Sequence, residues 1–270
     1  MTRGHRTALI GYTGFVGTTL LRSCSFDDVF RSTTIRQIEG REYDLVICAG
    51  VSAAKWIANR DPEGDRASIA KLTASLGVVR TREFILISTI DVYPHPASGE
   101  DESAAIDPVE NHAYGRNRYE LEQWVGDRFP LVRIVRLPAL FGEGLRKNTL
   151  FDLLNNKGLD QIHPLGEFQW YPVVRLSHDI ARVRDADLRL VNLFPPPLET
   201  NEITSAFFPA SVLGKTEGPA PRYDLRTRHN FVLGGGGGYI SDRITVLGEM
   251  AHFIGTERRR IDARSETPGA

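Results

Sequence analysis

A glycine-rich turn near the N-terminus limits what this 270-residue chain can fold into more than any other segment. The apolar run Thr7 to Ile10 leads directly into Gly11, Gly14 and Gly17, and a helical pattern follows from Thr18 to Leu21. Glycines at this GxxGxxG spacing let backbone N–H groups approach a phosphate closely at the positive end of a helix dipole. The segment predicts a strand, a phosphate-binding turn and a helix, and the alternative is a tight turn without a ligand.

Further strand and helix patterns alternate along the first half of the chain. The apolar runs Asp44 to Gly50 and Phe84 to Thr89 end in small residues, as buried parallel strands do where their carboxyl ends line a ligand crevice. Helical patterns over Asp65 to Val79 and His112 to Arg128 alternate with these runs, and Val132 to Leu137 resembles another strand. This rhythm predicts an α/β fold, a Rossmann-type doubly wound parallel sheet with a smaller C-terminal substrate lobe.

The periodic pattern loosens after about Phe141, where prolines and glycines become frequent. We therefore expect a dinucleotide-binding domain over residues 1–140, a mixed substrate-binding lobe interleaved with it over 141–262, and a polar tail over 263–270. The five-glycine run Gly234 to Gly238 follows no strand pattern and is predicted to be a flexible surface loop.

The composition excludes several classes of function. A net charge of −1 provides no broad basic surface for nucleic acid, and no run approaches the roughly 18 apolar residues that span a bilayer. The polar start of the chain does not resemble a signal peptide. Cys24 and Cys48 are too few for a disulfide framework, which predicts a reducing compartment such as the cytoplasm. The histidines show no metal-ligand spacing, so we expect no metal site.

Tyr114 and Arg118 form a candidate acid–base pair. They stand four residues apart in a helical pattern, so both side chains lie on one helix face. A phenol has a pKa of about 10 and exchanges protons poorly at neutral pH unless its anion is stabilised. Lowering that pKa to about 7 takes about 4 kcal/mol, and a cation one helical turn away supplies part of this.

Four motifs in order resemble those of one enzyme family. They are the GxxGxxG turn, Ser88-Thr89 ahead of Asp91-Val92-Tyr93-Pro94, a tyrosine followed four residues later by a base, and Arg136-Leu137-Pro138. In this order and spacing the chain resembles the extended short-chain dehydrogenase/reductases, the superfamily of NAD-dependent epimerases and dehydratases and of sugar-nucleotide reductases. The resemblance covers residues 7 to 200 and implies a Rossmann fold that binds NAD(P).

The resemblance also implies roles for individual residues. Thr89 hydrogen-bonds the substrate oxygen, and Tyr114 is the general acid or base. Arg118 stands where the family has a lysine that holds the nicotinamide ribose; arginine keeps the charge but is larger and does not relay a proton. The implied cofactor contacts are Gly11, Thr13, Gly14, Phe15, Val16, Gly17, Arg31, Ser32, Ala49, Gly50, Tyr114, Arg118 and Pro138. The implied substrate contacts are Asp91, Lys147, Asn148, Gln169, Tyr171 and Arg175.

Departures from the family motifs narrow the expected reaction. Dehydratases carry an Asp-Glu pair directly after the catalytic threonine, where this chain has Ile90 and Asp91. Members of the fucose-synthase kind need a cysteine at the position of Asp91. We therefore expect an NAD(P)-dependent reductase or epimerase acting on a nucleotide-linked sugar by hydride transfer. The alternative, which Arg118 favours, is a non-catalytic NAD(P)-binding protein, a redox sensor or a partner subunit.

The second predicted strand favours NADP over NAD as cofactor. It ends near Arg31 and Ser32, which suit a 2′-phosphate, and no acidic residue follows it to accept from a ribose hydroxyl. The expected partners are a nucleotide-sugar substrate and, as is common in the family, a second copy of the chain, with no nucleic acid and no membrane.

Overall fold

The computed structural model describes residues 5–214 and 218–265. The chain folds into two compact units, each formed from segments that are separate in the sequence. Unit 1 contains Met1–His95, Glu102–Leu137 and Leu176–Asn192, and unit 2 contains Pro96–Asp101, Pro138–Arg175 and Leu193–Ala270.

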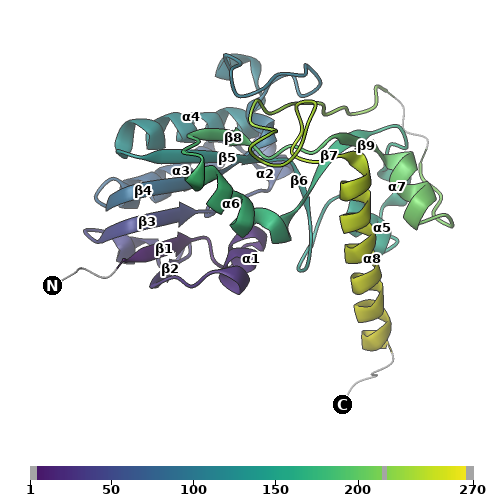
Figure 1. The fold of residues 1–270 in the computed structure, drawn as a ribbon, viewed down its shortest axis with the longest axis horizontal. Coiled ribbons are helices and arrows are strands. Elements are labelled where there is room, and N and C mark those ends of the chain that lie inside the picture. The colour runs from purple at the N-terminus through teal and green to yellow at the C-terminus, as the bar shows by residue number, and fades with distance from the viewer. Residues whose placement is uncertain (1–4, 215–217, 266–270) are drawn as a thin grey trace. The chain divides into compact units, whose positions relative to one another are not determined.

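Unit 1 is built on a six-stranded sheet in the order β2-β1-β3-β4-β5-β8 (Figure 1). Every neighbouring pair in this sheet is parallel, which confirms the predicted doubly wound α/β fold. Because all strands run in one direction, their carboxyl ends meet at the same edge of the sheet. The strands are β1 (Thr7–Ile10), β2 (Asp28–Phe30), β3 (Glu42–Cys48), β4 (Arg80–Thr89), β5 (Val132–Leu137) and β8 (Leu190–Asn192).

Helices of unit 1 cover the sheet and complete its core. Leu72 and Leu76 of α3 and Leu121 and Val125 of α4 are buried against strand residues such as Phe84. The α1 and α6 helices contact each other (Figure 1). The α-helices of the unit are α1 (Phe15–Ser23), α2 (Lys55–Arg60), α3 (Pro62–Leu76), α4 (Ala113–Arg128) and α6 (Leu176–Asp185), and its 3₁₀ helices are η1 (Ile35–Ile38), η2 (Ile90–Val92) and η3 (Pro108–Glu110).

A buried polar network holds the carboxyl end of β4 against α4 and β5. Glu122 is fully buried and pairs with the Arg136 guanidinium at 2.6 Å. The Ser88 hydroxyl donates to the same carboxylate at 2.5 Å, and Arg136 donates to the Tyr93 hydroxyl at 2.9 Å. Burying these charges is favourable only because each is paired and hydrogen-bonded. The network therefore holds the side chain of Ser88, the residue before Thr89, against α4.

Unit 2 contains a small sheet in the order β6-β7-β9 and a helical cover. Its core packs Trp170 of β7 with Leu150, Met250 and Phe253. Its strands are β6 (Ala139–Phe141), β7 (Glu167–Pro172) and β9 (Pro197–Glu199), its α-helices are α5 (Thr149–Leu154), α7 (Thr200–Phe207) and α8 (Arg243–Ser265), and its 3₁₀ helices are η4 (Leu159–Gln161) and η5 (Val173–Arg175).

The structure differs from the expected organisation in three places. Leu176–Asn192 belongs to unit 1, although the lobe was expected over 141–262, because β8 pairs with β5. The five-glycine run forms a compact turn: a Cβ on Gly235 would lie 2.0 Å from the Tyr239 carbonyl oxygen, and Thr227 N–H donates to the Gly238 carbonyl at 2.8 Å. The α8 helix continues to Ser265, and the rest of the predicted tail lies outside the described residues.

Candidate active site

Gly11 and Gly17 of the N-terminal turn are required by packing within the chain, whereas Gly14 is not. Gly11 has φ of +87°, and a Cβ there would lie 2.3 Å from the Ala49 carbonyl oxygen; a Cβ on Gly17 would lie 2.1 Å from that of Gly11. Internal packing therefore explains both. Gly14 is exposed, and a Cβ there would meet only the Gly11 carbonyl oxygen, at 3.4 Å. Packing within the chain does not require glycine at position 14, whereas close approach of a ligand would.

The Gly14 backbone also begins α1, so the turn ends at a helix N-terminus. No side chain caps this helix, and the N–H groups of its first turn have no acceptor within the helix. Phe15 and Val16 supply two of these N–H groups. A phosphate group at this place would find donors and the positive end of a helix dipole together.

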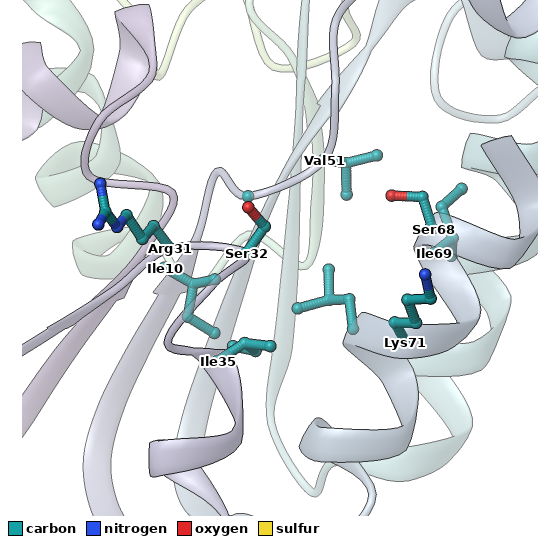
Figure 2. A pocket seen from close by; sticks show the side chains of 10 residues that line it. Ile10, Arg31, Ser32, Ile35, Val51, Ser68, Ile69 and Lys71 are labelled. Atoms are coloured by element: carbon teal, nitrogen blue, oxygen red, sulfur yellow. The ribbon is translucent and has the colours of Figure 1, made fainter. Parts of the chain in front are cut away.

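A pocket lies beside this turn in unit 1, between the segment after β2 and the α3 helix. Figure 2 shows Arg31 and Ser32 on one side and Ser68 and Lys71 on the other. Its apolar lining suits a planar base, and its polar rim suits a ribose or a phosphate. The remaining lining residues are Ile10, Ile35, Gly50, Val51, Ile69 and Leu72.

Tyr114 and Thr89 meet beyond the carboxyl end of β4. Thr89 is the last residue of β4, and Tyr114 lies in the first turn of α4, where it is 6% exposed. The Thr89 side chain lies next to the phenol and opposes the rise of its pKa. Gly115 allows this approach, since a Cβ there would lie 2.0 Å from the Asp91 carbonyl oxygen. The structure thus brings the two predicted catalytic residues together.

Arg118 is engaged by a residue that the sequence did not single out. Its guanidinium makes a two-pronged ion pair with Asp65 of α3 and donates to the Ser52 carbonyl at 2.5 Å. Both charged side chains are buried, at 5% and 8% exposure. The guanidinium also lies over the Tyr114 ring, 4.0 Å from its centroid. Arg118 therefore contacts the ring face of Tyr114 while Asp65 compensates its charge.

Burial dominates the electrostatics of Tyr114. It raises the pKa of the phenol above its usual value, and Asp91 adds to this rise. The charges of Arg118 and Lys55 and the neighbouring Thr89 side chain oppose it. The phenol is consequently protonated at neutral pH. In this state it can donate a proton to a ligand oxygen.

Asp91 lies between Thr89 and a second charged side chain, that of Lys55. Lys55 Nζ lies 2.6 Å from Asp91 Oδ1, and the Thr89 hydroxyl donates to Asp91 Oδ2 at 3.4 Å. His112 Nε2 lies 4.0 Å from Asp91 Oδ1. His112 also caps α4, because its Nδ1 accepts from Gly115 N–H at 3.0 Å. Its pKa is lowered by burial and by Lys55, which keeps the ring neutral and the cap intact.

Several predicted substrate contacts have structural roles in unit 2. Gln169 is buried and bridges two backbone segments through the Pro195 and Leu225 carbonyls, at 2.7 and 2.8 Å. Tyr171 is fully buried. Asn148 caps α5 by accepting from Phe151 N–H at 3.1 Å. Burial lowers the pKa of Lys147, and Arg175 lies 3.6 Å from Glu249. Pro138 directly follows β5. Substrate or cofactor contact by these residues stays a prediction.

Sequence reasoning missed Lys55, Asp65 and His112 at the site and the α3 side of the pocket. The spacing of Ser68, Ile69, Lys71 and Leu72 fits one helix face, but nothing in a single sequence shows what that face meets.

Within residues 5–214 and 218–265, no group of three His, Cys, Asp or Glu side chains could hold a metal ion. No helix in the same residues is long and apolar enough to cross a membrane.

Comparisons with known proteins find similarity in structure and not in sequence. No family model and no curated protein sequence matches the chain. A dTDP-4-dehydrorhamnose reductase from Clostridium acetobutylicum ATCC 824 is similar with a TM-score of 0.69 and 17% identity, over 94% of this chain and 99% of that one. The NAD-dependent NDP-hexosamine 5,6-dehydratase TunA, involved in tunicamycin biosynthesis, is similar with a TM-score of 0.67 and 17% identity, over 87% and 93%.

A third similar structure is the UDP-N-acetylglucosamine 4-epimerase of Methanobrevibacter ruminantium M1, in complex with UDP-N-acetylmuramic acid. It matches with a TM-score of 0.66 and 12% identity, over 83% of this chain and 90% of that one. The three proteins have different activities, so their likeness to this chain concerns architecture. The chain has the fold of these nucleotide-sugar reductases, epimerases and dehydratases, as its resemblance to the extended short-chain dehydrogenase/reductases predicted.

Proposed function

We propose that this protein is an NAD(P)-dependent enzyme that reduces or epimerises a nucleotide-linked sugar, with Tyr114 as its general acid. The observation that carries this proposal is the juxtaposition of Tyr114, at the start of α4, and Thr89, at the carboxyl end of β4. The three similar structures support it, because the name of each one gives a nucleotide-linked sugar as the compound it acts on. Reduction of a 4-keto nucleotide sugar, followed through the nicotinamide absorbance, tests it.

The chain's own residues fit a dinucleotide. Gly14 leaves room for a pyrophosphate at the N-terminus of α1, and the pocket beside β1 has an apolar lining for an adenine. Ala49 and Gly50 follow β3 next to this pocket. Thr13 is exposed in the turn and can contact the same phosphates.

In the proposed reaction a bound nicotinamide supplies the hydride. Tyr114 donates its phenolic proton to the substrate oxygen, and the Thr89 hydroxyl holds that oxygen in place. The phenol is protonated at neutral pH, because burial raises its pKa. This state suits reduction of a carbonyl, whereas oxidation of an alcohol requires the phenolate. We therefore favour the reductive direction.

A non-catalytic NAD(P)-binding protein is the second candidate function. Its support is the Arg118–Asp65 pair, in which a buried carboxylate compensates the cation that Tyr114 would otherwise use. A protein of this kind would bind the cofactor and show no hydride transfer with any sugar.

Replacing Gly14 with valine should weaken NADPH binding by about tenfold or more, which equals about 1.4 kcal/mol. The added side chain would occupy the place of the pyrophosphate, while the fold should persist because the Gly14 backbone (φ −80°, ψ 169°) suits any residue. Calorimetric titration measures the effect. Gly126→Val is the matched control, since a Cβ there meets nothing within 4 Å. Equal affinity in Gly14→Val and wild type would place the cofactor elsewhere.

Wild-type protein should bind NADPH at least about tenfold more tightly than NADH, because Arg31 can form a charge-assisted hydrogen bond with a 2′-phosphate worth about 1.5–3 kcal/mol. Arg31 and Ser32 line the pocket at the end of β2. Arg31→Met should remove most of this preference, and Arg36→Met, which changes an exposed arginine outside the pocket lining, should keep it. A tenfold preference of wild type for NADH would refute the assignment.

A further inference from the structure

Arg118 does not supply the proton that Tyr114 must regain after each turnover. A guanidinium stays protonated in proteins, so it holds charge without passing protons on. Its two terminal nitrogens donate to Asp65 and the Ser52 carbonyl, and its guanidinium lies over the Tyr114 ring face. Tyr114 is itself 6% exposed, so direct contact with water is restricted. A donor acid at this site therefore needs another route to solvent.

A series of polar side chains next to the phenol offers such a route. The Thr89 side chain lies next to the Tyr114 phenol, the Thr89 hydroxyl donates to Asp91 Oδ2 at 3.4 Å, and Lys55 Nζ lies 2.6 Å from Asp91 Oδ1. Exposure rises along this series, since the Asp91 side chain is 16% exposed and that of Lys55 is 37% exposed. The series therefore leads from a buried phenol to an ammonium in contact with solvent.

We propose that Tyr114 exchanges its proton with solvent through Thr89, Asp91 and Lys55. This exchange rests on the proposed role of Tyr114 as the acid, and it makes Lys55 a further functional residue. Lys55 lies in α2, whereas Tyr114 and Arg118 lie in α4. Lys55 is therefore a different residue from the lysine that would follow the tyrosine by four positions, where this chain has Arg118. Its ammonium is an acid that can lose a proton, which a guanidinium is not.

The proton balance of this relay is complete. When Tyr114 donates, its O–H bond breaks and an O–H bond forms on the acceptor. The phenolate then takes the Thr89 hydroxyl proton, and Thr89 takes one that has passed from the Lys55 ammonium through Asp91. The amine of Lys55 regains a proton from water. No electrons move in these steps, and each group ends in its starting protonation state.

Two further charged groups face this series. His112 Nε2 lies 4.0 Å from Asp91 Oδ1 and provides the competing exit to solvent. Arg118 faces the Tyr114 ring and is paired with Asp65. Replacing His112 with asparagine would preserve the cap of α4, because asparagine is a good N-cap residue, while removing the imidazole. This variant separates the two exits.

The test measures exchange of the Tyr114 hydroxyl proton directly, without cofactor or substrate. Protein labelled with ¹³C at the tyrosine Cζ is studied by NMR in an equal mixture of H₂O and D₂O, and Tyr114→Phe identifies the Tyr114 line. Fast exchange yields one averaged line, and slow exchange yields two lines, for the O–H and O–D forms. We expect one line for Tyr114 in wild type and in His112→Asn, and two lines in Lys55→Met and in Asp91→Asn.

Two more variants complete the design. Lys55→Arg keeps the charge next to Asp91 but not the dissociable proton, so it should also give two lines. Arg82→Met is the control, because it removes a charged side chain that pairs with Asp44 at the amino end of the sheet. It should give one line for Tyr114, as wild type does. A single line in Lys55→Met or Lys55→Arg, or two lines in His112→Asn alone, would overturn the relay. The enzyme assignment is judged separately by hydride transfer.

Discussion

Replacing Tyr114 with phenylalanine is expected to abolish turnover while leaving cofactor affinity nearly unchanged. The substitution removes only the phenolic oxygen, and loss of a general acid costs about 100- to 10,000-fold in rate. The aromatic ring remains below the Arg118 guanidinium, 4.0 Å from the ring centroid in the wild-type structure, so local packing should persist. Steady-state reduction of 4-keto nucleotide sugars measures the loss, and calorimetry with NADPH measures the affinity.

Tyr119→Phe is the matched control for this substitution. It removes one phenol from the same helix, at the residue directly after Arg118, and should retain wild-type turnover. Unchanged turnover in Tyr114→Phe would eliminate the proposed acid. A parallel loss of NADPH binding would instead show that Tyr114 serves the cofactor site.

Replacing Asp65 with alanine is expected to destabilise the fold by about 3–5 kcal/mol, because the Arg118 guanidinium is then buried without its counter-ion. The two side chains are 8% and 5% exposed, so water screens them little. The exposed pair of Arg66 and Glu120 provides the comparison, and Glu120→Ala should cost less than about 1 kcal/mol. Chemical denaturation measures both. Similar values for the two variants would show that the Arg118–Asp65 pair contributes no more than a surface ion pair.

The same pair explains why restoring the family lysine alone should not help. Lysine offers a point charge and cannot match the two-pronged contact that Arg118 makes with Asp65. Arg118→Lys is therefore expected to lower stability. In the Asp65→Ala background Arg118→Lys should cost less stability than in wild type, because the two-pronged contact is already absent, and a double-mutant cycle would show this difference as coupling between the two sites.

The fold could be predicted from the sequence because its central strands carry their own signal. Thr7–Ile10 is a largely apolar run, and Val132–Leu137 has apolar residues at four of its six positions; the two predicted segments match β1 and β5 residue for residue. β4 begins earlier than predicted, at Arg80, because charged residues at its amino end obscure the pattern. Leu190–Asn192 is too short to predict as a strand from its own residues.

The meeting of Thr89 and Tyr114, the proposed catalytic pair, could also be predicted from the sequence, while the residues around them could not. Thr89 and Tyr114 are part of ordered motifs, so their meeting could be expected. Asp65 lies 53 residues before Arg118, and Lys55 lies 36 residues before Asp91. A lone acid or lysine in a helical pattern indicates only a solvated surface. Gln169 was predicted to bind substrate because a motif suggested it, yet its amide joins backbone segments inside unit 2.

Transfer of deuterium from labelled NADPH to a sugar tests the central claim most directly. The protein would be incubated with NADPH deuterated at the transferred position and a panel of 4-keto nucleotide sugars, and mass spectrometry would follow the products. Reductases and epimerases share this half-reaction, so the outcome does not depend on which of them the protein is. We predict one deuterium on the sugar carbon in wild type and none in Tyr114→Phe. NADPH binding without deuterium transfer to any sugar of the panel would contradict the enzyme assignment and favour the non-catalytic NAD(P)-binding protein.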